Sequence, residues 1–64
     1  MRHTLRVTLS AGPDVRLTKY VVISSERSTA MKNELRVAAK EDADHDAQHA
    51  RMGPWTVLSS AWES

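Results

Sequence analysis

Two aspartates and two histidines in the second half of the chain recur at the spacing of one helix face. They are Asp42, His45, Asp46 and His49, at positions i, i+3, i+4 and i+7. Histidines four residues apart on a helix can share a divalent cation, and carboxylates can complete the shell or orient the rings. The set lacks the glutamate and third ligand of a metalloprotease, so we expect no resident metal or cofactor. The remaining interpretations are a partner-binding or pH-sensitive face, a solvated face, and metal-assisted assembly.

A second group of side chains is basic and lies in the first twenty residues. If these residues form a hairpin, one of its faces carries arginines, threonines and one tyrosine. Such a face resembles, in kind, surfaces that bind single-stranded nucleic acid. However, the chain has no RNP-like aromatic pair and no glycine-rich phosphate loop, and ladders of arginine and threonine are also ordinary solvent faces. Nucleic-acid binding is therefore an alternative, and its candidate residues are Arg2, Arg6, Arg16 and Tyr20.

Catalysis has little support in the sequence. No motif spaces a serine with a histidine and a carboxylate, and no carboxylate pair lies in an evident apolar pocket. A domain this small also seldom forms a ligand-sized pocket. We therefore expect a protein that is not an enzyme.

Length and composition limit the architecture. The chain has 64 residues, which is room for one domain, residues 1–64. A chain of this size buries only about 60% of the surface that its unfolded form exposes. The absence of cysteine excludes disulfides and thiolate zinc sites. Self-association, most simply as a homodimer, is therefore expected, and Trp62 is a candidate interface anchor if it is not a lid on the core.

Charge is distributed unevenly along the chain. Residues 1–40 carry eight basic and three acidic side chains, whereas residues 41–64 carry one basic and five acidic ones. The net charge of +1 gives no strong expectation of nucleic acid or membrane. We expect no signal peptide and no membrane-spanning helix, because the first residues lead into alternation and no run of about 18 apolar residues exists. The lack of cysteine fits a cytoplasmic location.

Period-two patterns predict a hairpin at the start of the chain. Leu5, Val7 and Leu9 alternate with polar residues, residues 10–14 have turn chemistry, and residues 15–23 alternate again. Lys19 falls on the apolar face of this second strand. Either a bulge turns it away, or the strand is an edge that Lys19 protects from pairing, and we favour the edge.

A helix is predicted after the hairpin. Ser25 or Ser28 is the expected N-cap, and the pattern runs to about Met52, where Gly53 and Pro54 prevent continuation. The apolar stripe of the first half is not continued, because the second half has only alanines, displaced by roughly 100°. Asp44 and Asp46 are also poor choices near a helix C-terminus. We therefore expect either a helix end that overhangs the sheet or alanines packed closely on it.

Residues 55–62 are predicted to form the third strand, which gives the order ββαβ. With the second and third strands parallel and the first between them, the crossover is split and the sheet order is 2-1-3. The expected fold is α+β, a three-stranded sheet with one long helix packed on one face. The opposite sheet face would be uncovered.

The chain resembles small hypothetical ββαβ proteins of actinobacterial phages. The resemblance rests on the basic hairpin, the helix rich in alanine and acid, and the segment GPWTVLSS at residues 53–60. It implies a viral protein that binds a host protein, and it implies no particular functional residue.

Taken together, these patterns favour a non-catalytic protein-interaction module of the cytoplasm that binds a protein partner. The candidate partner-binding residues are Asp42, His45, Asp46, His49 and Trp62. Nucleic-acid binding by the basic hairpin and metal-assisted assembly through the helix face remain as alternatives.

Overall fold

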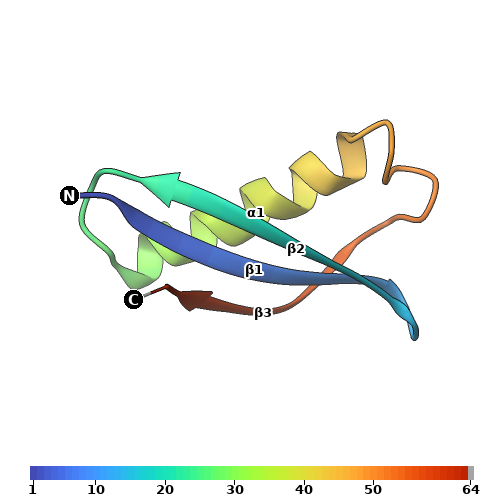
Figure 1. Ribbon diagram of the computed structural model, residues 1–64, viewed down its shortest axis with the longest axis horizontal. Coiled ribbons are helices and arrows are strands. Elements are labelled where there is room, and N and C mark those ends of the chain that lie inside the picture. Colours follow the sequence, from blue (N-terminus) through green and yellow to red (C-terminus); the bar gives the residue numbers. More distant parts are fainter. Residues whose placement is uncertain (64) are drawn as a thin grey trace.

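A computed structural model describes residues 1–63 of the chain. The central strand of its sheet is β1 (His3–Gly12). It pairs antiparallel with β2 (Val15–Ile23) on one side and with β3 (Thr56–Trp62) on the other. The order β2-β1-β3 makes both outer strands parallel to each other, as expected from the split crossover. The helix α1 (Thr29–His45) crosses one face of this sheet (Figure 1). The predicted α+β fold is confirmed.

The hairpin between β1 and β2 turns at Pro13 and Asp14. A register shift between Ser10 and Gly12 precedes the turn, and Gly12 has a φ of +155°, a conformation that favours glycine. The Ser10 hydroxyl donates to the Gly12 carbonyl at 2.7 Å. Strand β1 therefore continues through the first three residues of the predicted turn.

Strand β1 supplies most of the buried core. Its alternate residues Leu5, Val7 and Leu9 are fully buried against α1. The helix contributes only Ala39 and Ala43 to the buried cluster, and small side chains let its backbone approach the sheet. Trp55, which is 1% exposed, is the remaining member. A tryptophan that precedes β3 thus fills the space that the alanines leave.

Helix α1 begins where one of the two predicted caps lies. Ser28 has an extended backbone, and its hydroxyl accepts a hydrogen bond from the N–H of Met31 at 3.0 Å. This geometry is that of an N-cap. Ser28 is therefore the cap, and Ser25 lies outside the helix.

The predicted helix end at Met52 is wrong, because α1 ends at His45. The next residue, Asp46, is extended, and its carboxylate accepts the N–H of Gln48 at 2.8 Å in a local turn. Residues 47–52 continue as turns, and the bond from the Trp55 indole N–H to the His49 carbonyl, 3.2 Å long, draws the chain back to the core. Of the two arrangements expected from the sequence, an overhanging helix end or alanines packed closely on the sheet, the second is found: α1 has 17 residues, about 26 Å, and its Ala39 and Ala43 are buried.

The expectation of an outer position for residues 15–23 is confirmed, since β2 is an edge strand. Lys19 lies on the α1 side of the sheet without a bulge, and its ammonium contacts the Asp42 carboxylate at 2.6 Å. Strand β3 forms the other edge, with a register shift between its pairs to Thr8 and Leu9 that leaves Leu58 as the extra residue. No helix of the described residues is long and apolar enough to cross a membrane.

Candidate functional site

The four residues predicted to share a helix face are separated in the structure. Asp42 is exposed on α1 and binds Lys19, while His45 is the exposed last residue of the helix. Asp46 is the C-cap, and His49 lies beyond the helix with its ring edge-on to Trp55 at 6.0 Å. The prediction that all four lie on one face of a helix is therefore wrong.

Asp46 and His49 still lie near each other. The Nδ1 atom of His49 is 3.4 Å from an Asp46 carboxylate oxygen but makes no hydrogen bond within residues 1–63. The Asp46 carboxylate is held by the N–H of Gln48, which is the main reason why the pKa of Asp46 lies below its ordinary value of 3.8. Among the residues that the structure describes, no group of three or more His, Cys, Asp or Glu side chains is placed to hold a metal ion.

Trp62 is half-buried at the end of β3. It packs against the core cluster, and its ring meets that of His3 edge-on, with centroids 6.4 Å apart. One part of the side chain covers the core and another reaches solvent, and its role as an interface anchor stays a prediction.

The basic hairpin face lies on the side of the sheet away from α1. Arg6 and Tyr20 are direct cross-strand partners there, and Tyr20 is 61% exposed. Two of the arginines already have partners: Arg6 lies 3.6 Å from the Glu63 carboxylate, and Arg16 donates to Ser10 and to backbone carbonyls of the turn. Arg2 is exposed ahead of β1. Nucleic-acid binding by this face stays a prediction.

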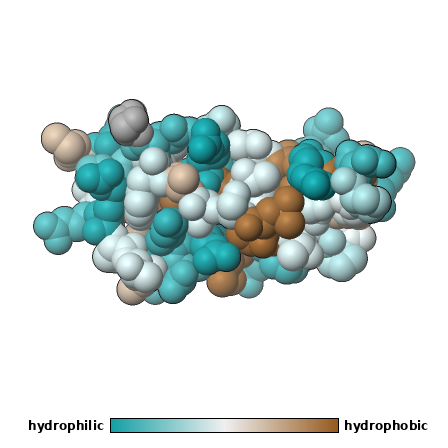
Figure 2. Space-filling model, turned by 90° about the horizontal axis from the view of Figure 1, so that it is seen from below, coloured by the Kyte–Doolittle hydropathy of each residue, from teal (hydrophilic) through white to brown (hydrophobic). Residues whose placement is uncertain are grey.

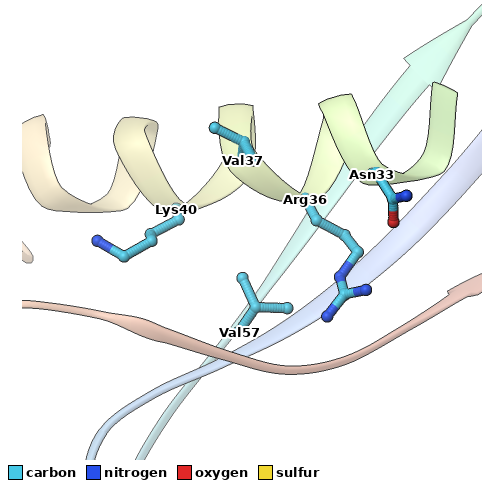
Figure 3. A pocket seen from close by; sticks show the side chains of 5 residues that line it. All are labelled: Asn33, Arg36, Val37, Lys40 and Val57. Carbon is cyan, nitrogen blue, oxygen red and sulfur yellow. The ribbon is translucent and has the colours of Figure 1, made fainter. Parts of the chain in front are cut away.

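A groove between α1 and β3 was missed from the sequence. It holds about 320 Å³. Arg36 reaches from the helix toward β3, Lys40 extends along the groove, and Val57 lies on β3 below them (Figure 3). The complete lining is Asn33, Arg36, Val37, Lys40 and Val57.

The lining of the groove contains two cations and no acid, and one of the cations, Lys40, is paired with an acid just outside the lining. Lys40 donates to the Asp44 carboxylate at 2.6 Å, one turn further along α1. Arg36 has no ion pair within residues 1–63, and its Nε atom is shielded from solvent without a hydrogen-bond acceptor. The groove therefore presents a guanidinium that no acidic side chain of the described residues neutralises.

Apolar surface surrounds these charges. Of the two valines that line the groove, Val37 is 57% exposed and Val57 is half-buried. Seen from the β3 side, apolar side chains gather near the middle of a surface that is otherwise mostly polar (Figure 2). An arginine beside a small apolar patch is a composition typical of protein-binding surfaces.

The corresponding groove on the β2 side differs in charge. It is lined by Lys19, Tyr20, Val21, Ala38, Ala39 and Asp42. Here the cation and the acid neutralise each other across 2.6 Å. The two flanks of α1 thus have grooves of similar volume, about 320 and 330 Å³, but different charge.

No protein-family model, no curated protein and no solved structure matches this chain.

Proposed function

We propose that this chain is a non-catalytic protein-interaction module that binds a protein partner through the groove between α1 and β3. The observation that carries the proposal is Arg36, which has no ion pair within residues 1–63 and lies in a groove with apolar walls. Arginines in such surroundings are frequent anchors of protein interfaces, since they combine charge, several donors and an apolar stem.

The acidic residues near the helix end support a structural role more than a catalytic one. Asp44 accepts hydrogen bonds from Lys40 and from the backbone of Trp55, and Asp46 accepts one from the backbone of Gln48. The bonds to the backbone of Trp55 and Gln48 fix the path of the chain between α1 and β3, and the bond from Lys40 lies within α1. This use of the carboxylates supports the proposal that the protein is not an enzyme.

The setting of the interaction follows from the sequence and belongs to the proposal. Because the chain resembles actinobacterial phage proteins, we propose that the partner is a host protein and that binding takes place in the host cytoplasm. A homodimer is a further part of the proposal, because a small domain with one uncovered sheet face gains stability by association. Light scattering at high micromolar concentration checks this part, and a monomer there contradicts it.

Affinity capture from an actinobacterial lysate tests the binding face. The Arg36→Glu variant is compared with Arg2→Glu, which changes the net charge equally at an exposed residue outside the groove. We expect Arg36→Glu to lose the captured protein and Arg2→Glu to retain it. Equal capture by both variants contradicts the groove as the interface, and selective loss in an Asp42→Ala and His45→Ala variant assigns binding to the exposed helix residues instead.

A further inference from the structure

We infer that the groove between α1 and β3 takes an extended acidic segment of the partner, which adds to the sheet as a fourth strand beside β3. This inference rests on the proposed function and specifies how the partner binds. Strand addition is a common mode of peptide recognition, in which backbone hydrogen bonds supply affinity and pockets for alternate side chains supply specificity.

The outer edge of β3 is open for pairing. The backbone N–H of Glu63 donates to the Thr4 carbonyl at 2.8 Å. This bond determines which residues of β3 direct their backbone N–H and C=O groups toward β1. In an antiparallel ladder, the backbone N–H and C=O groups of successive residues point alternately to the two sides of the strand. The N–H and C=O groups of Ser60 and Trp62 therefore point away from β1, toward the position of an added strand.

The other edge of the sheet is protected against the same event. Lys19 places a charge on the α1 side of β2, next to Asp42, and inward-pointing charges on edge strands are a known means of preventing strand addition. The side chains of β3 on the same side of the sheet are Val57, Ser60 and Trp62, none of which is charged. Of the two sheet edges within residues 1–63, the β3 edge is the one that combines open backbone groups with an uncharged inner row.

The charge of the groove selects the occupant. A carboxylate on the added strand would supply an acceptor to Arg36, and a side chain two residues away, about 6.8 Å along the strand, would reach Val37 and Val57. A second copy of this chain fits less well. Two-fold pairing of β3 with itself would place the two α1 flanks face to face, and the lining of neither groove offers a carboxylate to the Arg36 of the other copy.

A blocked synthetic peptide of seven residues tests the inference with the full chain. It has threonine at each odd position, valine at the second and sixth, and glutamate at the fourth. Fluorescence anisotropy should show saturable binding, weakened at least tenfold when lysine replaces glutamate, when alternate peptide nitrogens are methylated, or in the Arg36→Gln variant. Amide exchange at Ser60 and Trp62 should slow when the peptide binds.

Proline variants provide the matched control in the protein. Ser60→Pro removes an outward N–H from β3, whereas Thr18→Pro removes one from the outer edge of β2. We expect only the first to abolish peptide binding, with circular dichroism confirming that both variants fold; the methylated peptides carry the test if Ser60→Pro does not fold.

The outcomes distinguish this inference from the proposed function. Absence of saturable binding up to millimolar peptide, or equal binding of the methylated peptide, overturns strand addition. Equal binding of the lysine peptide overturns the acidic preference. A protein that is captured through Arg36 but not displaced by the peptide leaves the proposed function in place and overturns only the strand.

Discussion

The Asp44 carboxylate accepts a hydrogen bond from the backbone N–H of Trp55 at 2.8 Å, across a separation of 11 residues. This bond ties the last turn of α1 to the residue that precedes β3. The other carboxylate oxygen of Asp44 accepts from Lys40. One side chain thus connects the helix, the turn segment and the groove cation.

Acid should weaken the fold through this residue. The Lys40 side chain, and after it the Trp55 N–H, hold the pKa of Asp44 below its ordinary value of 3.8. When folding lowers a carboxyl pKa, the stabilisation is complete above the unfolded value and is lost as the pH falls from about 4 through the folded pKa. Because asparagine resembles the protonated side chain, the difference in melting temperature between wild type and Asp44→Asn should be present at pH 6 and shrink as the pH falls below about 4. A difference that is independent of pH contradicts this role, and Asp14→Asn in the exposed turn is the control.

Trp55 should account for a large part of the stability. Removing a buried tryptophan side chain costs about 3–5 kcal/mol, which is comparable with the whole stability expected of a domain this small. Trp55→Ala is therefore expected to be unfolded. Trp55→Phe keeps an aromatic ring but loses the bond to the His49 carbonyl, at about 1 kcal/mol. Circular dichroism without denaturant should show that Trp55→Ala is unfolded, and urea unfolding measures the loss in Trp55→Phe. A Trp55→Ala variant that folds and is as stable as Trp55→Phe would show that the indole N–H dominates.

Lys19 should prevent association through the β2 edge. Lys19→Leu removes the inward charge and extends the apolar row of β2, so concentration-dependent association should increase in light scattering. The loss of the pair with Asp42 should change the free energy of unfolding by no more than about 1 kcal/mol, since the Asp42 side chain is 69% exposed. Lys32→Leu on α1 is the matched control. A Lys19→Leu protein that stays as dispersed as wild type argues against this protective role.

The two candidate N-caps can be distinguished by substitution. Ser28→Ala loses the bond to the Met31 N–H and should reduce stability by about 1 kcal/mol. Ser25→Ala, three residues earlier, should leave the melting temperature nearly unchanged. A larger loss of stability in Ser25→Ala than in Ser28→Ala would show that Ser25 is the N-cap of α1.

Most of the fold is predictable from local patterns. The alternation of Leu5, Val7 and Leu9 with polar residues determines which face of β1 is buried, and the misplaced Lys19 correctly indicates an edge strand. The helix end was not predictable in the same way. Gly53 and Pro54 are strong stop signals, but the turn at Asp46 ends the helix before them, through a side-chain bond that competes locally with the helix.

The groove depends on contacts that no local pattern reveals. Arg36 and Lys40 read as ordinary basic residues of a helix, spaced i and i+4. Their relation to Val57 arises only when β3 pairs with β1 beneath the helix. In contrast, the spacing of His45 and His49 was visible in the sequence, but the chain leaves the helical path between them.

The pairing of β1 with both neighbours has a consequence for the order of folding. The pair of β1 and β2 that is nearest in sequence is Gly12 and Val15, three residues apart, whereas the nearest pair of β1 and β3 is Ser10 and Thr56, separated by most of the chain. Closing a longer loop costs more chain entropy, and contacts between distant residues slow folding. The hairpin can therefore form early, while the docking of β3 is the late event that completes the core, the groove and the open strand edge together.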